Sequence, residues 1–280
     1  MDRTERGKLQ ELISYHVDKF CEDHYDDGHR HHLGASLIGH ECSRKLWYTF
    51  RWVYHHKHPG RMQRLFNRGH REEERFCEWL RGIGAEVFEF DENGKQHRVT
   101  GVQGHFGGSM DGIVTLEKFG VGEPLLLEFK TSATGATFNK LKDSGVKCAK
   151  PQHFAQMSVY GMYRRIKFAL YMAINKNDDD IHIEIVELDW ELGKELERKA
   201  EHVIFSQEPP ERAFSSESYF ECKWCEYRKI CWNNENIELN CRSCSECKPI
   251  ANGEWQCSLY GVVPKQHLIE GCGKWKAISS

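Results

Sequence analysis

Helical spacing of apolar residues dominates the first part of the chain. Apolar side chains recur every three or four positions in segments 4–22 and 36–54, which predicts two amphipathic helices. A third stripe of the same spacing stops at Gly82 and Gly84, residues that favour the end of a helix. Glu73 lies in the middle of this stripe, so the third helix should carry a carboxylate on an otherwise apolar or small-residue face.

Beyond Gly84 the spacing changes to the alternation that is typical of strands. Strands are expected at 86–90, 97–102, 109–116 and 124–131. The last of these, PLLLEFKT, is an apolar run that ends abruptly in charge, as a buried central strand with a functional end would. A helix, two strands and a helix should follow at 151–163, 167–175, 181–188 and 190–206. This order predicts an α+β (α/β) fold in which helices flank a mixed central sheet.

Length and composition leave room for one main domain and a small appendage. The chain has 280 residues, of which 39% are hydrophobic, and single domains commonly hold about 100–200 residues. We expect an N-terminal helical segment at 1–33, a main domain at 34–235 and a module at 236–280 that folds around metal. No stretch approaches the ~20 apolar residues of a membrane span, and the first residues lack a signal sequence. We therefore expect a soluble, intracellular, cytoplasmic protein.

Chemically active residues fall in two neighbouring predicted strands. Glu128 and Lys130 lie two positions apart, so on a strand both point to the same side, while Phe129 turns to the core. If the two strands form a hairpin around a turn at 120–124, Asp111 can lie beside the pair. The sequence thus predicts two carboxylates and an amine at the end of a central strand.

Such a cluster suits the hydrolysis of a phosphodiester bond. Mg²⁺ and Mn²⁺ are hard ions that favour oxygen ligands, which Asp111, Glu128 and the carbonyl group of Phe129 would supply. Lys130 would position or deprotonate the attacking water and offset the charge of the phosphoryl group. Glu73 from the neighbouring helix would hold that water or a second ion.

Each part of this cluster also has a plainer interpretation. Glu128 and Lys130 alone would be an ordinary ion pair at a strand edge, and Asp111 alone would be a turn former. Glu72 and Glu74 are alternatives to Glu73, although the helical stripe favours Glu73. The cluster is specific only because its elements occur in this order on these element types.

These residues resemble the PD-(D/E)XK nucleases, above all their RecB-like and lambda-exonuclease-like branches. The match consists of Asp111, then Glu128 and Lys130, preceded by the helical Glu73. The resemblance implies a restriction-endonuclease-like core. It also implies catalytic roles for Gln156 and Tyr160, which match the Gln-x-x-x-Tyr motif of the following helix that lines the site and contacts DNA. Met110 stands where the class name has proline, a position that varies across the class.

A first group of cysteines has the spacing of a soft metal centre. Cys222, Cys225 and Cys231 place three thiols within one short segment. Adding the distant Cys42 gives a clasp that resembles the iron–sulfur nucleases related to RecB, including the CRISPR-associated exonucleases, over roughly residues 34–232. That resemblance implies a [4Fe–4S] cluster. A zinc site on the same cysteines is the alternative, since both metals accept four thiolates.

The remaining cysteines suggest a second centre near the C-terminus. A small zinc ribbon or knuckle is outlined by Cys241, Cys244, Cys257 and Cys272. Cys247 and His267 are alternative ligands, and the fourth position is open. Buried structural thiols are the interpretation for Cys21, Cys77 and Cys148.

The net charge of −3 requires any DNA contact to come from a local basic patch. The candidates are Arg44, Lys45, Lys140, Lys142, Lys147 and Lys150, the last four in an expected loop after the catalytic strand. A solvated loop is the alternative for these lysines. Trp47, Phe50 and Tyr54 share one helical face and should be buried. The histidine-rich stretches, which include His29, His31, His32, His55, His56 and His58, are expected to be solvent-facing loops.

Together these features favour a metal-dependent exonuclease that acts on DNA ends in recombination, repair or phage DNA processing. A structure-specific or nicking endonuclease would use the same chemistry. A third hypothesis is a non-catalytic DNA-binding protein whose metal clusters are structural, but the intact set of Asp111, Glu128 and Lys130 argues against it. The expected partner is DNA, as single strands or duplex ends.

Overall fold

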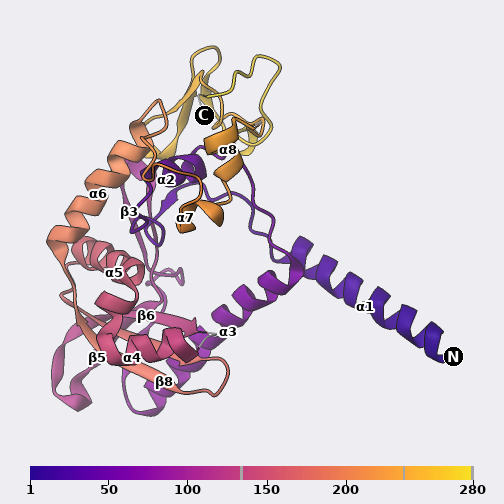
Figure 1. Cartoon of the computed structure of the whole chain (residues 1–280). Coiled ribbons are helices and arrows are strands. Elements are labelled where there is room, and N and C mark those ends of the chain that lie inside the picture. Colours follow the sequence, from indigo (N-terminus) through magenta and orange to yellow (C-terminus); the bar gives the residue numbers. More distant parts are fainter. Residues whose placement is uncertain (133–134, 236, 279–280) are drawn as a thin grey trace.

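A five-stranded mixed sheet forms the lower half of the structure in Figure 1, a computed structural model that describes residues 1–132, 135–235 and 237–278. Its strands are β2 (Glu86–Phe88), β5 (Gly112–Leu116), β6 (Val121–Ser132), β7 (Phe168–Asn175) and β8 (Ile181–Glu187), which lie side by side in this order. The central strands β6 and β7 are parallel, and the other neighbouring pairs are antiparallel.

Helices cover both faces of this sheet (Figure 1). The longer helices are α1 (Arg3–His24), α2 (Ser43–Phe50), α3 (Gly60–Gly82), α4 (Gly135–Ala149), α5 (Pro151–Arg164) and α6 (Trp190–Phe205). On one face, Phe76 and Leu80 of α3 pack among the inward side chains of the sheet, Phe129 included. On the other face, α4 and α5 form the crossover between the parallel strands. The predicted α+β fold with a mixed sheet between helices is confirmed.

The upper half of the structure holds two small sheets. Strands β1 (Leu33–Gly34), β4 (Phe106–Ser109) and β3 (Arg98–Gly101) form the first, in the order β1-β4-β3. Strands β9 (Cys247–Pro249), β10 (Trp255–Cys257) and β11 (Gly261–Val263) form the second, near the short helices α7 (Phe220–Lys223) and α8 (Arg228–Asn233). Helix α6 contacts α5 in the lower half and α2 in the upper half, so it ties the two halves together (Figure 1).

The segment expected to be one helix at 36–54 contains turns and only one short helix. Residues 33 and 34 pair with β4, the helical part is confined to α2, and Trp52 has a positive φ of 52°. Trp47 and Phe50 are buried as predicted, but Tyr54 is 39% exposed because it lies beyond the helix. The prediction of one long amphipathic helix was wrong, because turns occupy residues 35–39 and the helix is confined to Ser43–Phe50.

Two further boundaries differ from the sequence prediction. The expected strand 109–116 is split between β4 and β5, which belong to different sheets, and Asp111 lies between them. The hairpin of β5 and β6 turns earlier than 120–124, because Gly120 takes a left-handed conformation (φ 78°) and β6 starts at the next residue. The hairpin itself is the one that the sequence predicts, with Gly112 paired to Leu127.

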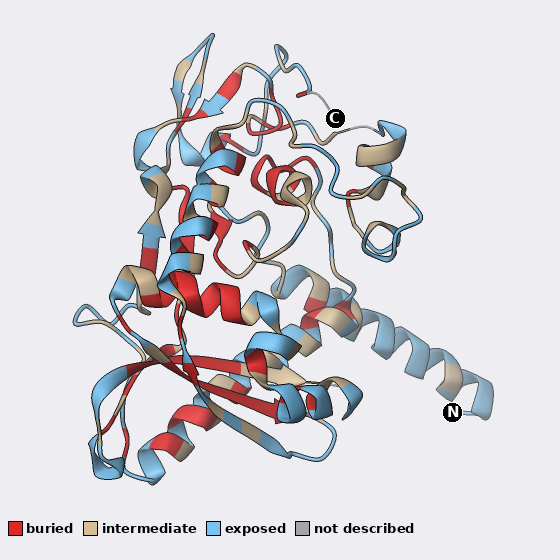
Figure 2. Cartoon of the chain, turned by 60° about the vertical axis from the view of Figure 1, so that its left-hand side comes forward, coloured by how far each residue is buried: buried red, intermediate tan, exposed pale blue. Residues whose placement is uncertain are grey.

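Helix α1 extends away from the rest of the chain, and Figure 2 shows it almost entirely exposed. A capping box formed by Asp2 and Glu5 starts the helix. None of the described helices combines the length and apolar character that crossing a membrane would require. Of the module expected at 236–280, residues 236, 279 and 280 lie outside the described residues.

Candidate active site

The β5–β6 hairpin places Asp111 against the central strand. Asp111 directly precedes β5, and its Oδ2 atom accepts a hydrogen bond of 2.6 Å from the backbone nitrogen of Phe129. The carboxylate is thereby fixed beside the end of β6, next to the residues on both sides of Phe129. The predicted convergence of Asp111 with Glu128 and Lys130 is therefore present in the structure.

Glu128 and Lys130 form an ion pair on the same side of β6. Glu128 is fully buried, its Oε1 atom pairs with the Lys130 Nζ atom, and its Oε2 atom accepts a hydrogen bond of 3.3 Å from Gln156. The Lys130 Nζ atom also donates to the Phe129 carbonyl oxygen at 3.0 Å. Phe129 points the other way and stacks on Phe76, with ring centroids 4.9 Å apart. The alternation of a strand thus separates the polar cluster from the core.

Electrostatics at this site push the carboxyl groups towards their neutral forms. Burial raises the pKa of Glu128 to about 7 and also raises the pKa of Asp111, because a desolvated carboxylate lacks water to stabilise its charge. Burial disfavours the charged form of Lys130 as well, but the carboxylates of Glu128 and Asp111 outweigh it and raise the pKa of Lys130. Lys130 therefore remains a cation within a cluster of negative charge.

Glu73 joins this cluster from the neighbouring helix. Burial and the nearby Asp111 carboxylate raise the pKa of Glu73 to about 7, while Lys130 lowers it. Glu72, the first alternative, instead bonds Arg75 at 2.6 Å, and Glu74 is exposed. The geometry favours Glu73, as the helical stripe predicted.

The raised pKa of Glu73 gives the metal-free protein a characteristic pH dependence. The folded state keeps a proton that the unfolded state has released, so this contribution to stability is fully present below about pH 4.5 and is lost as pH rises through about 7. Glu73→Gln should flatten the fall in urea midpoint between pH 5 and pH 7.5, measured in EDTA. Glu74→Gln, one position away and exposed, is the control and should keep the wild-type slope. Equal slopes for wild type and Glu73→Gln would contradict the assignment.

Gln156 and Tyr160 lie one turn apart on α5, facing the cluster. Gln156 bonds Glu128, and burial followed by the nearby Glu128 carboxylate raises the pKa of Tyr160. The ring of Tyr160 is buried, and a methyl group at Gly108 of β4 would overlap its hydroxyl group. A glycine therefore leaves the space that Tyr160 needs beside the site.

Gly108→Ala should displace Tyr160 and lower any activity of this site roughly 10- to 100-fold, since small displacements of positioning groups are costly. The fold should survive, because the tyrosine can shift. Gly122→Ala is the matched control: Gly122 also lies in a strand, and no atom lies within 4 Å of the place that its new methyl group would take. Initial rates that do not change in Gly108→Ala would show that the position of Tyr160 does not affect the activity of the site.

The donor set of this cluster fits a hard divalent ion. Asp111, Glu128 and the Phe129 carbonyl offer oxygen atoms from adjacent positions, and apart from the ion pair with Lys130 the buried Glu128 Oε1 atom has no hydrogen-bonding partner in the described part of the chain. Among the described residues, no three histidine, cysteine, aspartate or glutamate side chains are grouped closely enough to hold a metal as they stand. The oxygen ligands therefore support a metal site. The ammonium group of Lys130 lies against the oxygen atoms of Glu128 and Phe129, where the metal would bind.

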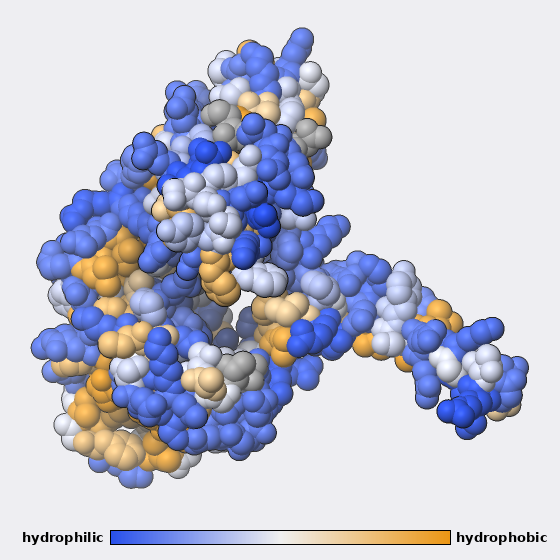
Figure 3. Space-filling view, viewed as in Figure 1, coloured by the Kyte–Doolittle hydropathy of each residue, from blue (hydrophilic) through white to orange (hydrophobic). Residues whose placement is uncertain are grey.

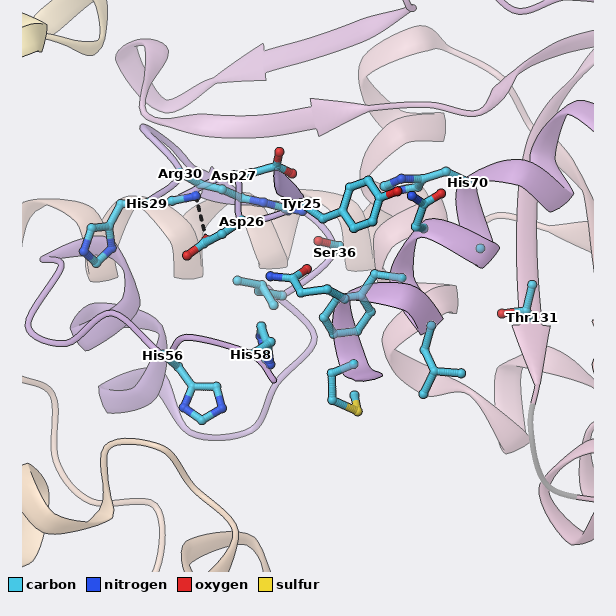
Figure 4. A pocket seen from close by; sticks show the side chains of 18 of the residues that line it. Tyr25, Asp26, Asp27, His29, Arg30, Ser36, His56, His58, His70 and Thr131 are labelled. Atoms are coloured by element: carbon cyan, nitrogen blue, oxygen red, sulfur yellow. Dashed lines mark hydrogen bonds between the residues drawn. The ribbon is translucent and has the colours of Figure 1, made fainter. Parts of the chain in front are cut away.

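A cleft of about 990 Å³ leads to this cluster. Figure 3 shows the hollow between the lower and upper halves, and Figure 4 shows side chains from several segments around it, His58, His70 and Thr131 among them. Glu73 and Lys130 line the cleft, as do residues from the stretch 24–37. The site thus lies inside a cleft rather than on an open surface.

Histidines line this cleft, most of them from the loops that the sequence predicts. The lining includes His24, His29, His32, His55, His56, His58 and His70. His29 stacks on Trp52 with ring centroids 4.9 Å apart, and His55 bonds Asp26 at 2.9 Å. Of the predicted stretches, only His31 is outside the lining. The sequence predicted no role for His70. Its position one helical turn before Glu73 is the signal that could have placed both residues on one face of the helix.

The predicted DNA-contacting residues lie away from the cleft. Lys140, Lys142 and Lys147 are exposed on α4, a helix where the sequence predicted a loop. Lys142 pairs with Asp180 at 2.7 Å, and Lys147 lies over the ring of Phe154 at 4.9 Å. Lys150, the residue before α5, is partly buried. The cleft instead draws its positive charge from Arg30, Lys130 and Lys176.

The first four cysteines lie near enough to influence one another's pKa, but in the described part of the chain no three of them are grouped closely enough to hold a metal as they stand. Burial raises the pKa of the Cys222 thiol, and the nearby Cys42 and Cys231 thiols raise it further; burial likewise raises the pKa of Cys225 to about 11, with Cys42 nearby. Cys42 caps the start of α2, while the other three lie in and around α7 and α8. Four thiols from distant parts of the sequence fit a thiolate-ligated metal.

Arg44 and Lys45 reinforce this clasp. Arg44 donates to the Pro210 carbonyl oxygen at 2.7 Å and to the Cys231 sulfur at 3.8 Å, and Lys45 pairs with Glu226 at 3.0 Å. Both side chains are therefore engaged with the segment that follows α6. Their contacts join α2 to the cysteine-rich segment rather than extending into the cleft.

The C-terminal cysteines also gather at one place. Burial, then Cys272, Cys244 and Cys257, raise the pKa of Cys241. Cys247 faces Cys257 across β9 and β10, and burial and the Cys241 thiol raise its pKa to about 12. The thiols of Cys241, Cys244, Cys247, Cys257 and Cys272 therefore influence one another electrostatically, although no three of the described side chains form a ready group of ligands.

The geometry also places His267 and the three remaining cysteines. The Nδ1 atom of His267 pairs with Glu270 at 2.8 Å, and its carbonyl oxygen accepts from the Cys241 sulfur at 3.7 Å, so His267 lies next to the C-terminal cysteines. Cys21 and Cys77 are buried, as predicted for structural thiols, but Cys148 is exposed on α4. The prediction for Cys148 was wrong because the segment expected to be a loop is a helix with Cys148 on its outer face.

Comparisons with known proteins give remote similarities of fold. No family model matches the chain, and no curated protein matches it. The crystal structure of SSO0001 is similar at 18% identity and a TM-score of 0.48, covering 81% of this chain and 98% of that one.

The chain is also similar to LHK-Exo in complex with dAMP, at 17% identity and a TM-score of 0.44, over 62% of this chain and 86% of that one. A further crystal structure of LHK-Exo, an alkaline exonuclease from Laribacter hongkongensis, has 17% identity and a TM-score of 0.43, over 62% of this chain and 87% of that one.

Proposed function

We propose that the chain is a divalent-metal-dependent deoxyribonuclease of the PD-(D/E)XK class that hydrolyses phosphodiester bonds at DNA ends. The observation that carries the proposal is the hydrogen bond from the Phe129 nitrogen to Asp111, which fixes that carboxylate beside the Glu128–Lys130 pair at the end of the central strand. This is the arrangement that the resemblance to the PD-(D/E)XK nucleases implies.

The residues of the site would divide the chemistry between them. Asp111, Glu128 and the Phe129 carbonyl would hold Mg²⁺ or Mn²⁺, which when bound supplies Lewis acidity towards the phosphate. Lys130, held as a cation by the two carboxylates, would orient the attacking water and balance the charge that develops on the phosphoryl oxygens.

Glu73 and the two residues of α5 would complete the site. Glu73 lines the cleft with a pKa near 7, so it can accept or hold a proton of the attacking water at neutral pH. Gln156 would orient Glu128 through its hydrogen bond, and Tyr160 would form the wall behind it.

An exonuclease is favoured by the position of the cluster inside the cleft. The stretch 24–37 and residues 54–58 lie across from Lys130 and Thr131, so a strand has to enter between walls to reach the cluster. A free end or a single strand can do this more readily than the middle of a duplex.

The two cysteine groups would be structural metal centres. We place a [4Fe–4S] cluster at Cys42, Cys222, Cys225 and Cys231, with zinc as the alternative, and Zn²⁺ at Cys241, Cys244, Cys257 and Cys272. The five neighbouring thiols at the second centre leave Cys247 as an alternative ligand.

An assay on linear and covalently closed circular DNA tests the proposed activity. End-labelled linear DNA should lose its label with Mg²⁺ or Mn²⁺ and remain intact with EDTA, while closed circles should remain intact in both. Cleavage of the circles would replace the exonuclease by an endonuclease with the same site. Binding that survives EDTA, with no cleavage under any divalent ion, would reduce the protein to a DNA-binding role.

A further inference from the structure

Two arginines are buried next to the C-terminal cysteines. Arg242 is 0% exposed and Arg51 is 1% exposed, which is rare for a residue that stays charged. In the described part of the chain, the hydrogen-bonding partners of both guanidinium groups are backbone carbonyl oxygens and no carboxylate, and three of their nitrogen atoms lack a partner: Arg51 Nε, Arg51 Nη1 and Arg242 Nε. Burial lowers the pKa of both groups, and their mutual repulsion lowers that of Arg242 further.

Aromatic rings surround the guanidinium groups but do not neutralise them. The guanidinium carbon of Arg242 lies 4.2 Å from the ring centre of Trp52, 4.4 Å from Phe50 and 4.5 Å from Trp255. These contacts are favourable, yet a buried cation normally needs an anion, because desolvation of a charge outweighs contacts with neutral groups. The anion should therefore lie on another side of the arginines.

The cysteines are the acidic groups that lie there. Arg51 Nη2 donates to the carbonyl oxygens of Cys244 and Cys247, at 2.9 and 3.0 Å, so its guanidinium spans the backbone that carries these thiols. Four thiolates around a divalent ion leave two negative charges in excess. Two cations beside such a centre would balance it.

Arg242 also reaches the wall of the cleft. Its Nη1 atom donates to the carbonyl oxygens of His31 and Arg30, at 3.2 and 3.4 Å, and its Nη2 atom donates to that of Phe50 at the end of α2. The indole nitrogen of Trp52 bonds the same Arg30 carbonyl at 2.9 Å. The backbone that presents the cleft-lining Arg30 is thus attached to the cysteine module through one buried cation.

We propose that Arg51 and Arg242 are the built-in counter-charges of an anionic metal–thiolate centre at the C-terminal cysteines, and that through Arg242 this centre supports the wall of the active-site cleft. The inference rests on the metal centre proposed above and not on nuclease chemistry. Loss of the metal leaves two cations without an anion, so the arginine contacts with the Arg30 and His31 carbonyls should loosen.

Zinc affinity and hydrogen exchange of the full chain test both halves of the proposal. Arg242→Met should weaken Zn²⁺ binding, measured by chelator competition, by at least about tenfold, and it should accelerate amide exchange at residues 28–33. Arg242→Lys restores the charge without the guanidinium fork, so it should recover the affinity to within about threefold while exchange at 28–33 stays fast. Arg81→Met, an exposed arginine on α3, is the control and should change neither quantity.

Two further variants keep the test decisive. If Arg242→Met does not fold, Arg51→Met and chelator-treated wild type replace it, and each should again accelerate exchange at 28–33 but not within α5. Asp111→Asn should keep wild-type zinc affinity and exchange, so loss of cleavage in that variant bears on the nuclease proposal alone. Wild-type zinc affinity and exchange in Arg242→Met, or wild-type protein with no metal at the C-terminal cysteines, would overturn the inference.

Discussion

Replacing Lys130 by methionine should lower the rate of DNA cleavage by about a thousandfold. Methionine keeps most of the length and apolar volume of the side chain and removes only the ammonium group. That group makes an ion pair with Glu128 and bonds the Phe129 carbonyl, so it lies beside the proposed metal site, and a bound metal would free it to balance the charge of the phosphate. Because this interaction strengthens in the transition state, kcat should fall far more than KM for DNA changes.

Lys194→Met is the matched control for this experiment. Lys194 is half-exposed on α6 and pairs only with the neighbouring Glu191, at 2.7 Å, among the described residues. Its replacement should leave kcat within a factor of about two. A Lys130→Met protein that cleaves DNA within tenfold of the wild-type rate, with unchanged Mg²⁺ dependence, would remove Lys130 from the catalytic cluster.

Replacing Cys225 by serine should remove the first metal centre and lower the melting temperature by about 10 °C. A metal bound by these thiols would join Cys42 at the start of α2 to the segment after α6, so its binding would contribute directly to folding. The wild-type protein should contain iron and show visible charge-transfer absorption, and the variant should show neither. Metal analysis, absorption spectra and thermal melts measure these effects.

Cys148→Ser provides the control, because Cys148 is exposed on α4 and belongs to neither group of cysteines. It should keep the metal content and melting temperature of the wild type. A colourless wild-type protein that contains one zinc at these cysteines would contradict the iron–sulfur assignment and keep the clasp. Identical metal content and melting curves in wild type and Cys225→Ser would contradict the clasp itself.

The convergence of Asp111, Glu128 and Lys130 was predictable because local periodicity determines it. Alternation along a strand puts Glu128 and Lys130 on one side and Phe129 on the other, and a short hairpin leaves Asp111 only one place to lie. Helical spacing likewise separated Glu73 from its two glutamate neighbours. In each case the side-chain direction follows from the element type alone.

The cleft could not be predicted, since long-range packing forms it. The stretch after α1 lies at the cleft because β1 pairs with β4 and because Trp52 and Arg242 bind its backbone, contacts between residues far apart in the sequence. The lysines of α4 were misplaced for a related reason. The expected loop is the helix α4, whose Phe138, Leu141 and Val146 are buried, and Gly145 interrupts it with a φ of 69°.

The most direct test of the account is to locate a bound metal in crystals of the full chain grown with Mn²⁺. Anomalous scattering should place one manganese ion within about 2.0–2.2 Å of a carboxylate oxygen of Asp111, a carboxylate oxygen of Glu128 and the carbonyl oxygen of Phe129, with Lys130 released from Glu128. Well-ordered crystals in which saturating Mn²⁺ gives no peak between Asp111 and Glu128 would contradict the central claim that these residues form a hydrolytic metal site.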